Sequence, residues 1–123
     1  MNNKEDAINK TLEAVLEGIQ RIKGKNITLI DLNTIKHTEC GYFIICHGTS
    51  NTQVDAIAHS IEDTVKELRN ENPWHRDGYK NSLWILLDYG DIMVHVFQQE
   101  AREFYNLEGL WADAKITNIA KDN

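Results

Sequence analysis

The turn Gly48–Asn51 lies between an apolar run and an amphipathic segment, so its backbone amides could bind an anion. Unpaired amides at a helix start, together with the helix dipole, favour phosphate groups. The turn lacks the lysine of a phosphate-binding loop and the three glycines of a dinucleotide fingerprint. Ser50 and Gln53 have the spacing of a capping box, in which side chains satisfy these same amides. The residues therefore predict a capped helix start and leave nucleotide binding open as an alternative.

This strand, turn and helix also resemble the opening of nucleotidyltransferases, which hold Mg²⁺ with two carboxylates two residues apart on a strand. That spacing places both carboxylates on one face of the sheet. Here Asp88 and Asp91 are three residues apart across a turn, and the next apolar run carries Met93 and His95 instead of acids. The sequence thus predicts the scaffold without its metal site. The alternative is a nucleotide-binding or nucleotidyl-transferring enzyme that uses Gly48–Asn51.

Histidine and cysteine side chains near one another in the sequence could suggest a zinc site: His37, Cys40, Cys46 and His47. Zinc needs three or four ligands that converge at about 2.0–2.3 Å. Adjacent residues of a strand point to opposite faces, so Cys46 and His47 cannot converge. No serine or cysteine occupies a nucleophile elbow. We therefore expect no metal, no cofactor and no catalytic residue, and the chain is not predicted to be an enzyme.

Length and composition indicate one small acidic domain. The chain has 123 residues, 41% of them apolar, with two cysteines and a net charge of −6. It contains no apolar run near the roughly 20 residues that cross a bilayer, and its first residues lack a basic-then-apolar pattern, so we expect no signal segment. We expect a domain over residues 1–113, a polar, frayed tail over 114–123, a cytoplasmic location and no membrane partner. The acidity argues against direct nucleic-acid binding.

The negative charge is concentrated late in the chain. Residues 88–113 carry six acids and one base, and the same stretch contains five aromatic residues. Aromatic anchors supply affinity, while charges steer association and select partners. This combination favours a basic protein partner, although a solvated face over ordinary core aromatics would show the same composition.

Hydrophobic periodicity predicts the elements that must position these residues. Helices are expected at 5–23, from about 51 to 69 and at 98–105, with a further turn or packed tail near residues 107–111. Strands are expected at 26–32, 42–46, 83–88 and 91–97, the last two as a hairpin around Tyr89-Gly90. Residues 70–81 are expected to form a loop. The order αββαββα predicts an α/β fold, with a small mixed β-sheet flanked by helices.

Trp84 is the aromatic residue that this arrangement marks for a partner. With a period of two, Trp84, Leu86 and Asp88 share one strand face, and a face that ends in a carboxylate is expected to be accessible. Trp84 is therefore predicted to be a large exposed indole beside carboxylates. Tyr105 and the segment that contains Trp111 could extend the same patch, or Trp111 could dock that segment on the core.

Five segments together resemble the ribosomal silencing factor family, also called the Iojap-like proteins, over about residues 5–113. They are Tyr42–Cys46, Gly48–Asn51, Trp84–Asp91, His95–Phe97 and Ala101–Trp111. The resemblance implies a nucleotidyltransferase-like domain without the metal carboxylates. It also implies a repressor that binds a basic ribosomal protein, universal large-subunit protein fourteen. Bound there, the family stops the small subunit from joining when nutrients are scarce, and related forms act in large-subunit assembly.

When the family's ribosome-facing positions are transferred motif by motif, the resemblance implies such residues in the hairpin and in the C-terminal segment. They are Trp84, Asp88, Asp91, Arg102, Tyr105, Leu107 and Leu110. The same patch could instead pair two copies of the chain as a homodimer, which would have to open before it bound the large subunit.

Overall fold

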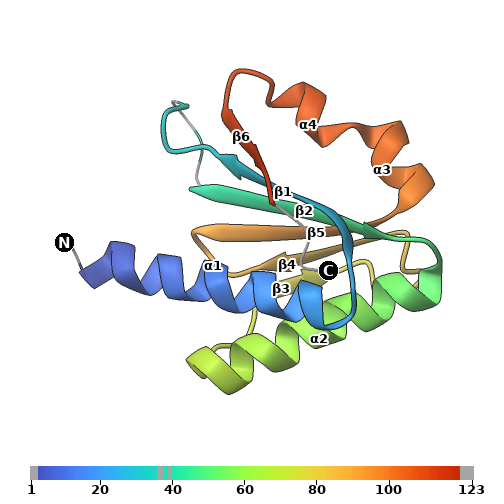
Figure 1. Cartoon of the computed structure of the whole chain (residues 1–123), viewed down its shortest axis with the longest axis horizontal. Coiled ribbons are helices and arrows are strands. Elements are labelled where there is room, and N and C mark those ends of the chain that lie inside the picture. Colours follow the sequence, from blue (N-terminus) through green and yellow to red (C-terminus); the bar gives the residue numbers. More distant parts are fainter. Residues whose placement is uncertain (1–2, 36–37, 39, 120–123) are drawn as a thin grey trace.

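A six-stranded sheet with helices on both faces forms the fold (Figure 1). The computed structural model describes residues 3–35, 38 and 40–119. The strands lie in the order β3-β4-β5-β2-β1-β6, and β2 pairs with β5 in parallel while the other pairs are antiparallel. The predicted fold class is therefore confirmed. The strands are β1 (Lys25–Asp31), β2 (Tyr42–Gly48), β3 (His75–Asp77), β4 (Trp84–Asp88), β5 (Ile92–Gln98) and β6 (Lys115–Asn118).

Two long helices, α1 (Asn3–Arg21) and α2 (Asn51–Arg69), lie side by side against one face of the sheet (Figure 1). Their apolar stripes are fully buried at Val15 and Ile19 and at Ile57 and Ile61. The two backbones approach closely at Gly18, where a Cβ atom would lie 2.7 Å from the Cα of Ile61. No helix in the described part of the chain is long and apolar enough to cross a membrane.

The strand β2 leads into α2, which returns the chain toward the other half of the sheet. Both faces of β2 are buried, with Ile44 and Ile45 fully inaccessible, as expected for a strand covered on both sides. The predicted cap is confirmed at the helix start. Ser50 Oγ accepts a hydrogen bond from the Gln53 amide at 3.1 Å, and Gln53 Oε1 accepts one from the Thr49 amide at 2.7 Å.

The predicted hairpin is confirmed, with β4 and β5 antiparallel. The Tyr89 amide donates to the Ile92 carbonyl at 2.8 Å, which closes the turn. Gly90 has a φ of +87°, and a Cβ atom there would lie 2.8 Å from the Trp74 ring. The turn therefore requires glycine for its backbone conformation and for the space that Trp74 occupies.

Two strands lie where the sequence predicts none. The strand β3 forms inside the predicted loop 70–81, and β6 forms inside the predicted tail. The expectation of a frayed tail is wrong for β6, because Ile116 pairs with Ile30 of β1 and the Ile119 amide donates to the Ile27 carbonyl at 2.8 Å. Residues 120–123 lie outside the described part. Before β6 the chain forms α3 (Gln99–Tyr105) and α4 (Leu107–Leu110), close to the predicted helix and turn.

Candidate protein interface

The sheet face that α1 and α2 leave uncovered carries the predicted partner residues. On β4, Trp84, Leu86 and Asp88 are half-buried, whereas the alternating Ile85 and Leu87 are fully buried under the helices. The predicted sharing of faces is therefore confirmed. The helix α3 lies across β5 and β2 on this side, so only part of the face remains open (Figure 1).

Trp84 is less exposed than the sequence predicts. Its ring stacks on Phe97 with centroids 4.8 Å apart and contacts Tyr105 at 4.9 Å. Its indole N–H donates to Nδ1 of His95 at 3.0 Å. The residue remains partly accessible and lines an open hollow of about 270 Å³. The predicted large exposed indole is thus corrected to a half-buried ring with a fixed orientation.

Exposed apolar side chains gather at the end of α3 and on α4. Tyr105 is 50% exposed, and its neighbour Phe104, whose ring lies edge-on at 5.1 Å, is 81% exposed. Leu110 on α4 is 74% exposed. Phe104 is absent from the predicted site residues, although the apolar pair Phe104-Tyr105 at a helix end could have indicated it. Asn106, at a φ of +46°, ends α3 and starts α4.

Two side chains of the C-terminal segment, Leu107 and Trp111, point inward, toward the sheet. Both are partly buried and pack on a core cluster that includes Ile30, Ile45 and Phe97. The Trp111 ring lies edge-to-face on Phe43 with centroids 5.8 Å apart. These two residues therefore anchor α4 and the following segment on the sheet, which leaves Leu110 as the exposed apolar side chain of α4.

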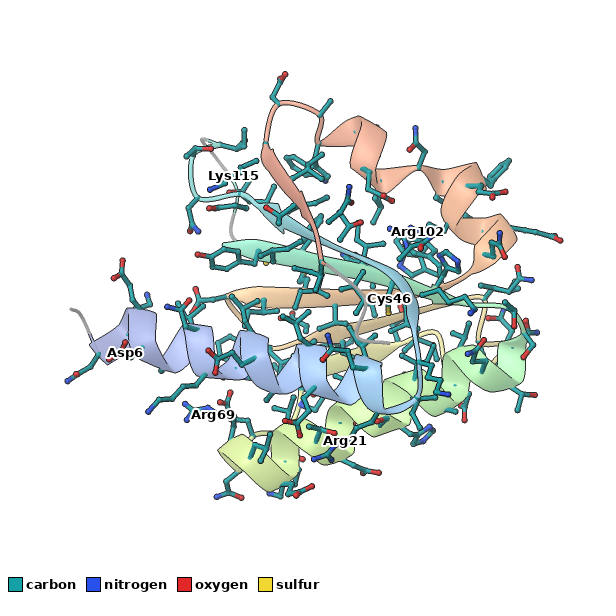
Figure 2. All side chains as sticks on the ribbon, in the orientation of Figure 1. Asp6, Arg21, Cys46, Arg69, Arg102 and Lys115 are labelled. Carbon is teal, nitrogen blue, oxygen red and sulfur yellow. The ribbon has the colours of Figure 1, made fainter. Side chains whose placement is uncertain are left out.

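Arg102 is an internal residue, and its predicted place at a partner-facing position is corrected. Figure 2 shows it between α3 and the sheet, and it is only 8% exposed. Its guanidinium donates to both carboxylate oxygens of Glu108, to the Asn26 carbonyl at 2.6 Å and to the Thr28 hydroxyl at 3.0 Å. It also donates to Nδ1 of His47 at 3.0 Å. Burial, with the nearby Arg102 charge, lowers the pKa of His47.

The hairpin end holds Asp88, Asp91 and a third tryptophan. Asp88 Oδ1 accepts a hydrogen bond from the Gly90 amide at 2.8 Å, so this carboxylate also stabilises the turn. Asp88 and Asp91 line an open hollow of about 370 Å³ together with Trp74. Trp74 is 80% exposed, and it is absent from the predicted site residues.

Asp77 is a further carboxylate that the sequence did not indicate. It is exposed at the end of the edge strand β3, pairs with Leu86 of β4 and lines the same hollow as Trp84. Because no apolar pattern marks its strand, spacing arguments cannot place Asp77 beside Trp84.

The residues that a zinc site or an anion site would need do not come together in the structure. Cys46 packs in the core beneath the helices, and burial raises the pKa of its thiol to about 12, whereas His47 contacts Arg102 on the other face. His37 lies outside the described residues. Within them, no group of three or more His, Cys, Asp and Glu side chains could hold a metal ion. In the turn that the alternative interpretation assigns to anion binding, the Thr49 amide is already bonded to Gln53.

Comparison with known proteins gives consistent matches. The family model described as "Ribosomal silencing factor during starvation" matches residues 4–123. Ribosomal silencing factor RsfS of Halalkalibacterium halodurans is 38% identical, over 92% of this chain and 88% of that protein. The chloroplastic protein Iojap of Zea mays is 41% identical over 66% of this chain and 35% of its own length.

A solved structure of a Chromobacterium violaceum protein superposes with a TM-score of 0.78. It is 29% identical and covers 98% of this chain and 94% of its own. The sequence matches span most of the chain, and the structural match extends across its sheet and helices. The chain therefore belongs to the ribosomal silencing factor family.

Proposed function

We propose that the chain is a non-enzymatic, cytoplasmic repressor of translation that binds the large ribosomal subunit and blocks joining of the small subunit under nutrient limitation. Its binding site would be universal large-subunit protein fourteen, a basic ribosomal protein. Membership of the family supports association with the ribosome. One structural observation supports the binding surface most strongly: an aromatic patch beside carboxylates on the sheet face free of α1 and α2.

The aromatic patch consists of Trp84, Phe104 and Tyr105. The Tyr105 ring contacts Trp84 at 4.9 Å and Phe104 at 5.1 Å. Leu110 on α4 adds an exposed apolar side chain. Rigid aromatic rings lose little conformational entropy on binding, so they make effective anchors.

Carboxylates beside this patch and at the far end of its hairpin would meet lysine and arginine side chains of the ribosomal protein. Asp77 lies in the hollow beside Trp84, and Asp88 and Asp91 lie at the far end of the same hairpin. Rim charges of this kind raise the association rate and exclude partners of like charge. Arg102 takes no part, because its guanidinium is engaged internally.

Repression would follow from steric exclusion. A protein of 14.2 kDa seated on the subunit-joining face need only occupy free large subunits before they meet small ones. Binding then stabilises the free large subunit against joining by a free energy of RT ln(1 + [L]/Kd), where [L] is the concentration of the free repressor. A second copy of the chain could cover the same patch in solution, and such a dimer would dissociate before binding.

Co-sedimentation of the purified protein with separated ribosomal subunits tests the proposal. We expect the protein to sediment with large subunits and to reduce their joining to small subunits. Trp84→Ala and Tyr105→Ala should each weaken this binding by about 1–3 kcal/mol while the fold survives. Leu68→Ala is a matched control, since Leu68 is 48% exposed on α2 and lies on the other side of the sheet.

Full inhibition of subunit joining by the Trp84→Ala/Tyr105→Ala double variant would show that the patch is not the binding surface. Absence of the wild-type protein from the large-subunit fraction would reject the function itself. Sedimentation of the free protein across a dilution series would reveal whether a dimer competes for the patch.

A further inference from the structure

A buried histidine lies directly behind the aromatic patch. His95 occupies the central strand β5 and is 5% exposed, between the fully buried Val94 and Val96. Its Nδ1 accepts the indole N–H of Trp84 at 3.0 Å. The ring also contacts Phe43, with centroids 4.7 Å apart, and stacks on Phe97 at 6.2 Å. Aromatic rings thus surround the imidazole.

The hydrogen bond fixes which nitrogen of His95 carries the proton. Because Nδ1 accepts from Trp84, the neutral ring must carry its proton on Nε2. Nε2 is buried and has no hydrogen-bond partner among the described residues. Burial also lowers the pKa of His95 to about 4, so the ring is neutral at physiological pH.

An apolar side chain would suit this position better for folding alone. Burying an N–H group without an acceptor is unfavourable, and a ring of aromatic neighbours offers good packing to a leucine. Replacing a buried polar residue by an apolar one of similar size is close to neutral when no partner is left buried and unsatisfied, and the N–H of the half-buried Trp84 can turn toward water. What His95 alone provides here is an acceptor for the indole of Trp84.

We propose that His95 is a positioning residue of the partner-binding surface: its Nδ1 holds the Trp84 indole in the orientation that meets the large-subunit protein. This inference rests on the proposed function. Trp84 is only half-buried, so without the acceptor its N–H would turn toward water and the ring would sample other orientations. Ordering such a side chain on binding reduces affinity, and the hydrogen bond removes that cost in advance.

Two variants separate positioning from packing. Asn and Leu differ little in shape, but the Oδ1 atom of asparagine can occupy the place of Nδ1, whereas leucine offers no acceptor. We expect His95→Leu to keep or raise the urea midpoint of unfolding and to weaken large-subunit binding about three- to tenfold, the range expected for one ordered side chain. His95→Asn should bind within about twofold of the wild type, since one hydrogen bond is restored.

Indole ¹⁵N–¹H NMR gives a readout that does not depend on the ribosome. Trp84→Phe assigns the Trp84 signal by its disappearance. We expect that signal to be protected from hydrogen exchange in the wild type and in His95→Asn and to lose protection in His95→Leu. The Trp84→Phe/His95→Leu double variant should bind no more weakly than Trp84→Phe alone, because both changes remove the same hydrogen bond.

The outcomes distinguish this inference from the proposed function. If Trp84→Ala weakens binding but His95→Leu does not, His95 has no positioning role and the proposed surface stands. If His95→Asn folds and loses as much affinity as His95→Leu, the acceptor is irrelevant and the inference is wrong. If Trp84→Ala itself binds normally, the proposed surface is wrong, and the inference is rejected with it.

Discussion

At the scale of single residues, Arg102 connects the C-terminal helices to the sheet. Its guanidinium joins Glu108 of α4 to the Asn26 carbonyl at the start of β1 and to Thr28 within it. Tyr105 follows three residues later on the same helix. The orientation of the aromatic patch therefore depends on a buried charge that does not itself reach the surface.

Arg102→Met should destabilise the fold by about 2–4 kcal/mol, because removing one partner of a buried, hydrogen-bonded ion pair leaves the others unsatisfied. Urea denaturation measures the change. Arg76→Met is a matched control: Arg76 pairs with Glu62 at 2.7 Å, but its side chain is 46% exposed, so its loss should cost at most about 1 kcal/mol. Equal stability of the Arg102→Met variant and the wild type would contradict the internal role.

At the scale of elements, the packing of α1 on α2 depends on Gly18. Glycine weakens a helix interior relative to alanine by about 0.5–1 kcal/mol, so helix propensity alone favours replacing it. The close approach of the two helices has the opposite effect, since a Cβ atom at Gly18 would lie 2.7 Å from a backbone carbon of Ile61 and 3.1 Å from the Ser60 carbonyl oxygen. Backbone atoms of a neighbouring helix cannot move aside as a flexible side chain can.

Gly18→Ala is therefore predicted to lower the free energy of unfolding by about 1–3 kcal/mol, the typical cost of overpacking. Asn9→Ala tests propensity without the clash, because Asn9 is exposed on the same helix. That variant should be neutral or slightly stabilising. Denaturant unfolding measures the stability of both variants. A Gly18→Ala variant more stable than Asn9→Ala would contradict the predicted clash.

The elements that the sequence predicts are those with an apolar period. The helices α1 and α2 and the strands β2, β4 and β5 each bury one or both faces, so their hydrophobic residues recur at regular spacing. The edge strands carry no such signal: β6 and β3 are exposed at every residue. They are held by backbone pairing to neighbouring strands, which no local pattern encodes.

At the scale of the whole molecule, the candidate site combines segments that only the fold brings together. The face of Trp84 follows from its position on β4, but its burial does not, because Tyr105 of α3 and His95 of β5 provide the cover. Arg102 likewise looks like a surface charge until Thr28, 74 residues away in the sequence, is found beside it. Long-range contacts of this kind escape spacing arguments.

The acidic character of the molecule should govern how fast it finds a basic partner. Of the net charge of −6, a net of −5 lies in residues 88–113, which include the hairpin end and the helix α3 that carries Phe104 and Tyr105 of the aromatic patch. Asp77 adds a carboxylate beside Trp84 from a separate part of the chain. Steering by such a field raises association rates at low salt and fades as salt screens the charges.

Asp77→Asn and Asp91→Asn should each slow association with the large subunit by about two- to fivefold at low salt and leave dissociation nearly unchanged, since rim charges act mainly on the association rate. The salt dependence of the rate should become shallower in the double variant. Asp63→Asn, exposed on α2 at the opposite side of the sheet, removes the same charge and should have a smaller effect. Stopped-flow association at several salt concentrations measures the wild type and every variant. An equal slowing by Asp63→Asn would mean that total charge, and not its placement beside Trp84 and the hairpin, governs the encounter.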